Sequence, residues 1–399
     1  MLFNSILLLS AQVPLQWNGI LNDKIPGWNF EPSNPENGMS YNPYEGYYPD
    51  KGGKLSSPLI HLLGKDGEPG YYRIRFNAES RERAYQGVDF FDAEGKRLPD
   101  CYDVIYPGSA QNYDRVIYAM EKVAAMKIFF RSRSGIRIRD LQVDSATVSE
   151  AADYCDRVYS ECPALNFQAP GNAMEQLPKT TEALLKGTSW HVLMLGDSIM
   201  QDTFHSLFHA LLKREYPSSN FRFTISVRGS TGCWFYCQAD NFKKYVLDES
   251  KPDLVMIGGI SNYLTDCKPG GAEAVEIVIR AIKAHYPKTE IVILSAPLAA
   301  DTRPHDSEHP TFPLPARPWI WEQDRYVRSA FKKDLVEMAR RNGVAFWDIS
   351  TPSYTWLYQS CTPYEWHNRD MVHSGERGKQ IIARIMMEYF KTISKESVK

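Results

Sequence analysis

The sequence predicts a two-domain α/β protein, in which an antiparallel β-sandwich precedes a three-layer α/β/α domain with a five-stranded parallel sheet. Three observations predict this fold class. The 399 residues are more than one average hydrophobic core organises. Short strand-like runs fill the residues up to about 150, and from residue 189 short apolar runs alternate with helical stretches. We therefore expect domains at 17–150 and 188–399, joined by a linker at 151–187.

Residues 1–16 begin with the apolar stretch MLFNSILLLSAQ. This stretch is much shorter than the roughly 20 apolar residues of a membrane-spanning helix, so we expect no membrane span. It resembles the apolar region of a secretory signal and ends in small residues, although a positively charged start is missing. We expect a targeting segment and a secreted or periplasmic protein.

Residues 27–50 are dense in Pro, Asn, Gly and Tyr, a composition that favours loops over helix. The strand-like runs that follow are rich in β-branched and aromatic residues, alternate in part, and are separated by turn residues. These runs are GYYRIRFNAES, YQGVDFFDAEG, DRVIYAMEKV, AAMKIFFRSR and GIRIRDLQVD. The pattern predicts an antiparallel β-sandwich that ends near Val148.

In the second domain, each expected strand is a nearly continuous apolar run, as in parallel strands buried on both faces. The five runs are WHVLMLG, FRFTISVR, DLVMIGG, EIVILSAP and VAFWDIS. Helical stretches at 201–216, 240–248, 272–286, 325–342 and 375–393 alternate with them. Right-handed crossovers then put helices on both faces of one sheet, with the active site at the carboxyl ends of its strands.

Ser198 stands in a Gly-Asp-Ser at the end of the first of these strands, where ligands bind in such folds. A serine hydroxyl is a weak nucleophile until a base takes its proton, and a carboxylate must orient that base. Asp370 and His373, in NRDMVHSGERGKQ after the fifth strand, offer both groups at a spacing that lets the carboxylate reach Nδ1. The alternative is that Ser198 only caps the helix that follows it.

Acyl transfer also requires hydrogen-bond donors for the oxyanion. The turn after the second strand, RGSTGCW, contains Gly229 and Gly232, and the turn after the third, GGISNYL, contains Asn262. A glycine lets its backbone N–H approach a ligand closely, and an asparagine amide can donate as well. Taken singly, each residue is better explained as part of a turn or a cap. Four blocks in order at the strand ends nevertheless favour a catalytic site.

With these four blocks, the chain from about residue 189 to its end resembles the SGNH (GDSL-type) hydrolase family. The resemblance implies a flavodoxin-like fold, Ser198 as the nucleophile, Asp370 and His373 as its partners, and no cofactor. It also implies an oxyanion hole made by the backbone N–H groups of Ser198 and Gly232 and the side chain of Asn262. The third block departs from the family's Gly-x-Asn-Asp, because the residues at 258–262 are GGISN. Either this turn is one residue longer, or Asn262 is not the donor.

The composition indicates the substrate class only coarsely. With 46 Lys and Arg against 48 Asp and Glu and no long basic run, neither nucleic acid nor an anionic membrane is an expected partner. A neutral or small polar substrate fits better. Aromatic residues, 13% of the chain, suit stacking on sugars as well as a β-rich core.

A jelly-roll-like, carbohydrate-binding-like β-sandwich ahead of an SGNH domain resembles the arrangement in bacterial carbohydrate O-acetylesterases. The function expected from this resemblance is the removal of O-acetyl groups from an acetylated polysaccharide or oligosaccharide. One alternative is another SGNH activity, as a lipase, thioesterase or acyltransferase. The other is a glycan-binding protein without catalysis.

The candidate substrate-binding residues belong to the loops around the four blocks. They are Asp197, Trp234, Trp321, Tyr364 and Trp366. Trp321 ends a proline-rich insertion at 297–321, which we expect to wall one side of the cleft. The aromatic residues of YTWLYQSCTPYEWH either stack on sugars or pack together as a small core.

The seven cysteines suit an oxidising compartment, and no pair has the C-x-x-C spacing of a zinc or redox site. We expect a disulfide from Cys267 to Cys233 or Cys237, which would hold the oxyanion loops together. Cys155 and Cys162 are expected to form a local pair.

Two histidine pairs have the four-residue spacing of metal ligands on a helix. They are His205 with His209 and His305 with His309. Because no carboxylates join them, we expect histidines on the surface or at an interface, and no metal site.

Overall fold

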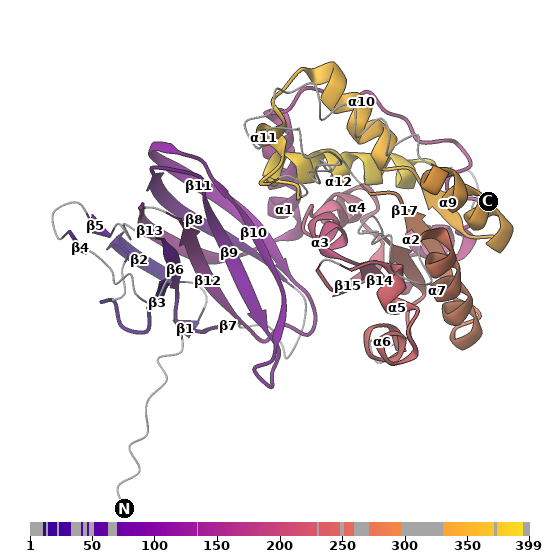
Figure 1. Cartoon of the computed structure of the whole chain (residues 1–399), viewed down its shortest axis with the longest axis horizontal. Helices are drawn as coiled ribbons and strands as arrows, with labels where there is room; N and C mark the ends of the chain where they lie inside the picture. Colours follow the sequence, from indigo (N-terminus) through magenta and orange to yellow (C-terminus); the bar gives the residue numbers. More distant parts are fainter. Residues whose placement is uncertain are drawn as a thin grey trace, which may run out of the picture. The chain divides into compact units, whose positions relative to one another are not determined.

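The structure is a computed structural model of the chain. It describes residues 11–12, 15–21, 24–32, 41–42, 46–47, 52–62, 70–133, 135–229, 231–247, 251–258, 271–296, 330–370 and 373–393. The chain forms two compact units, Met1–Tyr154 and Cys155–Lys399 (Figure 1). The helices α1 (Val148–Ser160) and α2 (Pro178–Lys186) occupy much of the segment for which the sequence predicts a linker.

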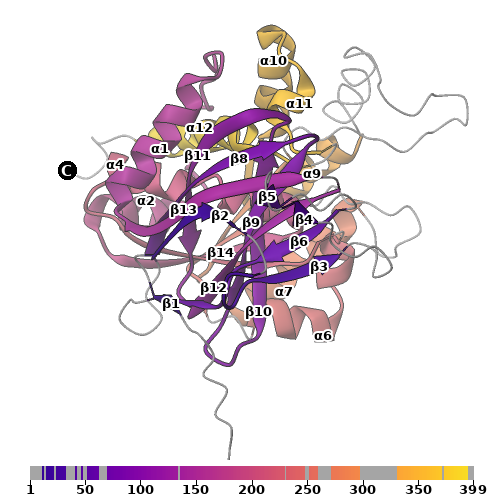
Figure 2. The same cartoon turned by 90° about the vertical axis from the view of Figure 1, so that its left-hand side faces the viewer.

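The N-terminal unit contains two large sheets, which Figure 2 brings to the front of the view. One sheet contains β1 (Ala11–Gln12), β3 (Asn29–Pro32), β6 (Gly53–Ser56), β7 (Ile60–His61), β9 (Ala84–Phe91), β10 (Arg97–Ile105) and β12 (Ala125–Ser132). The other has the order β11-β8-β13-β2, with β2 (Leu15–Ile20), β8 (Gly70–Ser80), β11 (Gly108–Ala119) and β13 (Ile136–Ala146). The short strands β4 (Tyr41–Asn42) and β5 (Gly46–Tyr47) pair separately. Among the described residues of this unit, all strand pairings are antiparallel except that of β1 with β7.

The core of this unit lies between the two sheets. Buried and less buried residues alternate along β8, as expected for a strand with one face toward a core. The ring of Phe76 on β8 meets the edge of Phe130 on β12 at 5.2 Å, which joins the inner faces of the sheets. Arg115 on β11 crosses the same interior and donates to Gln86 Oε1 on β9 at 3.0 Å. These contacts confirm the predicted β-sandwich.

The C-terminal unit is built on one parallel sheet with the order β15-β14-β16-β17-β18. Its strands are β14 (Ser189–Gly196), β15 (Asn220–Val227), β16 (Leu254–Ile257), β17 (Glu290–Leu294) and β18 (Ala345–Trp347). The order of first appearance along the chain is thus 2-1-3-4-5, which is the flavodoxin-like arrangement. Every apolar run predicted as a strand is a strand, and the structure confirms the five-stranded α/β sheet.

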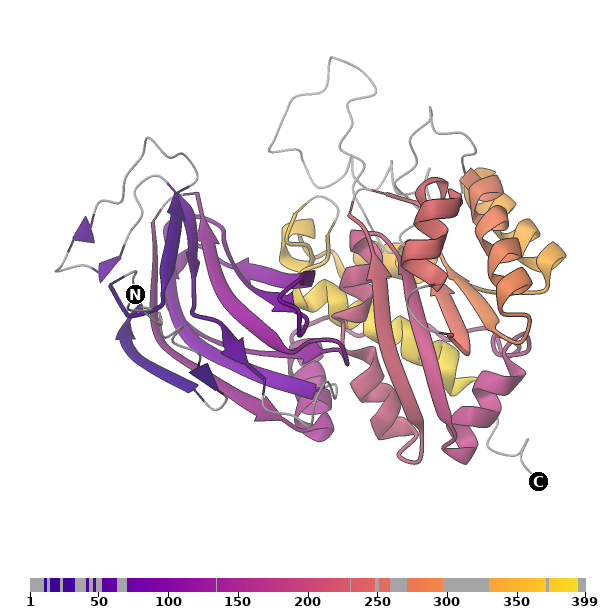
Figure 3. The ribbon, with the colours of Figure 1, turned by 90° about the horizontal axis from the view of Figure 1, so that it is seen from below.

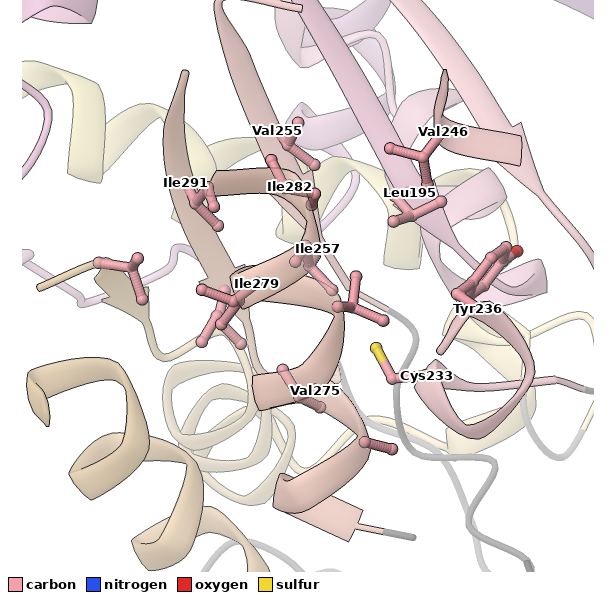
Figure 4. Close-up of a cluster of buried hydrophobic side chains, with 14 of the residues drawn as sticks. Leu195, Cys233, Tyr236, Val246, Val255, Ile257, Val275, Ile279, Ile282 and Ile291 are labelled. Atoms are coloured by element: carbon pink, nitrogen blue, oxygen red, sulfur yellow. The ribbon is translucent and has the colours of Figure 1, made fainter. Parts of the chain in front are cut away.

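Helices cover both faces of this sheet, as Figure 3 shows from below. On one face α5 (Cys233–Tyr236), α6 (Ala239–Phe242), the π-helical turn η1 (Lys243–Leu247), α7 (Gly271–His285) and α9 (Ala330–Asn342) enclose a hydrophobic core. Figure 4 shows Ile279 and Ile282 of α7 beside Val255 and Ile257 of β16 in this core. Packed together elsewhere in the unit are α3 (Ser198–Phe204), α4 (Phe208–Glu215) and α12 (Glu376–Lys391), with α10 (Ser350–Ser360) and α11 (Tyr364–His367) beside α12.

The helix expected at 201–216 is divided into α3 and α4. Leu207, at the break, has a φ of 60°, in the left-handed region that ends helices. After the break the chain buries His209, which is only 4% exposed and lies between the rings of Phe204 and Phe223. The expectation that His209 lies on the surface is therefore wrong, and burial lowers its pKa to about 3.

The structure also contradicts the expected disulfides. Cys155 and Cys162 are both free, and their sulfurs hydrogen-bond to different carbonyls, those of Ser206 and Val158. Cys233 and Cys237 are free as well, so neither forms the expected bridge; Cys267 lies outside the described residues. In the parts of the chain that the structure describes, no helix has the length and apolar character needed to cross a membrane.

Candidate active site

Ser198 is the first residue of α3, directly beyond the carboxyl end of β14. The helix is capped by its neighbour Asp197, whose Oδ1 accepts from the N–H of Ile199 at 2.8 Å. Asp197 is fully buried and its carboxylate caps the helix terminus, whereas its expected role in substrate binding stays a prediction. The alternative explanation of Ser198, that it only caps the helix, therefore does not hold, because Asp197 is the cap. The hydroxyl of Ser198 is half buried and bonds to another residue.

That partner is His373. Its Nε2 lies 2.8 Å from Ser198 Oγ, and its Nδ1 lies 2.9 Å from both carboxylate oxygens of Asp370. An ionised carboxylate can only accept, so Nδ1 carries the proton and Nε2 is left to accept from the serine hydroxyl. Asp370 Oδ1 also accepts from the backbone N–H of His373 at 2.8 Å. The three side chains form one hydrogen-bonded chain.

The segment with Asp370 and His373 is a closed loop. Asn368 and Ser374 pair in an isolated β-bridge, and Gly375 N donates to the carbonyl of His367 at 2.7 Å. Within the loop, Asp370 and His373 stay half exposed, with 36% and 21% of their side chains accessible. The side chains of Asp370 and His373 are therefore accessible to solvent and to a substrate.

The second block lies at the start of α5. Gly232 is the residue before this helix and has an extended backbone, with φ at −162°. Four residues later, the hydroxyl of Tyr236 donates to the carbonyl of Gly196 at the end of β14. This bond ties α5 to the strand that leads to Ser198. The oxyanion role of Gly232 remains a prediction, and Asn262, the third expected donor, lies outside the described residues.

The aromatic candidates for substrate binding divide into two kinds. Tyr364 is buried, with 9% of its surface exposed, and its hydroxyl accepts from Asn368 Nδ2; its expected role in substrate binding stays a prediction. Trp356, from the same sequence stretch, is also buried, with Nε1 donating to the carbonyl of Pro163. Trp366 is half buried, and the guanidinium of Arg377 covers its ring at 4.2 Å.

Two further candidates remain. Trp234 is half buried on α5, two residues after Gly232. Trp321 lies outside the described residues. A buried ion pair joins Asp202 and Arg369 beside the loop; no sequence motif indicates it, since the two residues are 167 positions apart.

Comparison with protein families gives one match. Residues 194–381 match the GDSL-like Lipase/Acylhydrolase family, and this segment contains the Gly-Asp-Ser, Gly232 and the loop with Asp370 and His373. The matched segment is thus similar in sequence to GDSL-type acylhydrolases. Within the chain, the segment 194–381 is a GDSL-like domain, which confirms the resemblance seen in the sequence.

Several solved structures are similar at low identity. A two-domain esterase (CEX) active on acetylated mannans shares 14% identity, over 56% of this chain and 54% of that chain, with a TM-score of 0.42. The acetyl xylan esterase AlAXEase shares 15%, over 49% of this chain and 98% of that one, with a TM-score of 0.36. A Corynascus thermopiles (Myceliophthora fergusii) carbohydrate esterase family 2 enzyme with a carbohydrate binding domain shares 11%, over 92% and 99%, at 0.34. This chain thus covers little more than half of the length of the mannan esterase. The search of curated proteins found no match to this chain.

Proposed function

We propose that this protein is a serine esterase that removes O-acetyl groups from a polysaccharide or oligosaccharide. The observation that carries the proposal is the hydrogen-bonded chain from Asp370 through His373 to Ser198. This is the arrangement that makes a serine hydroxyl a nucleophile. A glycan-binding protein without catalysis would have no need of an imidazole oriented in this way.

The first half of the reaction transfers the acetyl group to the enzyme. Ser198 Oγ attacks the carbonyl carbon of the acetyl ester while its proton passes to His373 Nε2. The bond between the carbonyl carbon and the sugar oxygen then breaks, and the sugar oxygen takes the proton from Nε2. Throughout, Asp370 holds the proton on Nδ1 and stabilises the imidazolium by its charge.

The second half releases acetate. A water molecule gives its proton to His373 Nε2 and attacks the acetyl carbon, and Ser198 Oγ recovers the proton as it leaves. In both halves, the negative charge on the carbonyl oxygen is stabilised by the N–H groups of Ser198 and Gly232 and the amide of Asn262. No cofactor takes part in this scheme.

The carbohydrate substrate is supported by composition and by the surroundings of the site. The formal charge of the chain is −2, which suits a neutral substrate. Trp234 and Trp366 are half-buried aromatic rings on segments next to Gly232 and Asp370, where they would contact sugars. Such a substrate fits the secreted or periplasmic location that the sequence predicts.

The test is acetate release from acetylated mannan, acetylated xylan and an aryl acetate, with the wild type and Ser198→Ala. Mannan and xylan belong in the panel because similar structures carry those substrates in their names. We expect release from the aryl acetate and one glycan, with a loss of more than about 1,000-fold in the variant. Ser160→Ala, at an exposed position on α1, is the control and keeps full activity. Equal aryl acetate hydrolysis by the wild type and Ser198→Ala would exclude Ser198 as the nucleophile.

A further inference from the structure

A buried ion pair lies beside the loop that carries Asp370 and His373. Asp202 Oδ1 accepts from Arg369 Nη1 at 2.6 Å, and the two side chains are only 5% and 4% exposed. Taking two charges out of water offsets most of their mutual attraction, so such a pair is a weak stabiliser of a fold. Its hydrogen bonds are directional, however, and they fix the positions of the groups that they join.

The ion pair holds both ends of the loop. Arg369 directly precedes Asp370, and Ser374 directly follows His373. Asp202 Oδ2 accepts from the backbone N–H of Ser374 at 3.1 Å, while Arg369 Nη1 also donates to the Ser374 carbonyl at 2.6 Å. The backbone N–H of Arg369 donates to the carbonyl of His373 at 3.0 Å. The carboxylate of Asp202 thereby bonds to Arg369 and Ser374, which flank the catalytic candidates Asp370 and His373 on either side.

The same carboxylate is attached to the helix that carries the nucleophile. Asp202 follows Ser198 by four residues on α3, one helical turn or about 6 Å along the axis. Residues at this spacing lie on the same face of a helix. One rigid turn of α3 therefore connects Ser198 to Asp202, the residue that holds the loop.

We infer that Asp202 and Arg369 are positioning residues, which hold His373 Nε2 within hydrogen-bond distance of Ser198 Oγ. The hydrogen bonds of the two side chains described above join them to each other and to Ser374, so the effect passes through the loop and through α3. The inference rests on the proposed function, because the position of His373 affects the rate only if Ser198 is the nucleophile.

The main variant is Asp202→Asn, which keeps the size of the side chain but replaces one accepting oxygen with a donor. It can no longer accept from both Arg369 and Ser374, so the loop shifts. A displacement of about 1 Å at reacting atoms costs on the order of 100-fold in rate. We expect kcat for an aryl acetate to fall about 100-fold with KM within about threefold of wild type. The rate at which a fluorophosphonate labels Ser198 is expected to fall by the same factor.

A second variant, Arg369→Lys, keeps the positive charge. An ammonium lacks the planar fork of the guanidinium, so it reproduces the contacts to Asp202 and Ser374 poorly. We expect a smaller fall of about tenfold in both kcat and the labelling rate. This variant decides the question if Asp202→Asn does not fold.

The matched control is Glu290→Gln, which also neutralises a buried carboxylate in the same unit. Glu290 is 8% exposed and accepts from Lys179 N, Thr180 N and Thr180 Oγ1 at 2.6–2.8 Å, where it caps α2. We expect its Tm to fall while kcat and the labelling rate stay at the wild-type values.

Two outcomes count against the inference. It is wrong if both ion-pair variants are folded by circular dichroism and keep kcat and labelling within about twofold of wild type, whatever their Tm. If Ser198→Ala retains wild-type hydrolysis in the same assay, the proposed function fails and the inference fails with it. The Ser198→Ala arm therefore separates the two failures.

Discussion

Replacing Gly196 with alanine tests how tightly the strand ends place Ser198. The added Cβ would lie 1.9 Å from the Gly258 carbonyl oxygen on the neighbouring chain segment after β16. Real Cβ contacts are essentially never shorter than 3.0 Å, so the two segments must separate by at least 1.1 Å, the difference between these distances. Gly196 cannot retreat easily, because its carbonyl accepts from Arg228 N at 3.0 Å on the other side.

Ser198 follows only two residues later and moves with this strand end. A shift of about 1 Å lowers kcat/KM on the order of 100-fold, and the forced overpacking lowers the free energy of unfolding by about 1–3 kcal/mol. Steady-state hydrolysis of an aryl acetate and urea unfolding measure the two effects. Gly171→Ala is the matched control, since its added Cβ meets nothing within 4 Å. A folded Gly196→Ala enzyme with kcat/KM within about threefold of wild type would refute the reasoning.

Three further changes test the site and the core. Asp370→Asn removes the acceptor that keeps the proton on Nδ1, so kcat falls about 10⁴-fold with little change in KM, measured by steady-state kinetics. Burial lowers the pKa of both His209 and His367 to about 3, well below the 6.5 of an exposed histidine. Between these values the unfolded chain binds more protons, so stability is full above pH 6.5 and falls toward pH 3. Urea unfolding at pH 7 and pH 5 should show a loss of about 2 kcal/mol for each histidine. Trp347→Ala removes a fully buried ring that stacks on Tyr389 at 4.9 Å, so urea unfolding should show a loss of about 3–5 kcal/mol; a loss below about 1 kcal/mol would contradict this packing.

The local pattern of the sequence predicted the elements that depend on neighbouring residues. A short apolar run such as VLML at 192–195 is typical of a strand buried on both faces, and β14 contains it. Where the pattern was weak, the sequence predicted no element. The stretch at 350–360 has no clear helical periodicity, yet it forms α10 because Asp348 accepts from Thr351 N at 3.1 Å and from Ser350 Oγ at 2.9 Å at its start.

The sequence by itself determined the two-part architecture, the order of strands and helices, and the choice of Ser198, Asp370 and His373 as candidates. It did so because periodicity and the motifs at strand ends are local properties of the chain. Only the tertiary structure decided that Asp197 caps α3, that Tyr364 is buried, that Cys155 and Cys162 form no disulfide with each other, and that Asp202 pairs with Arg369. These features depend on which distant segments of the chain approach one another and on which polar groups are then removed from water. Residue spacing determines neither of these two factors.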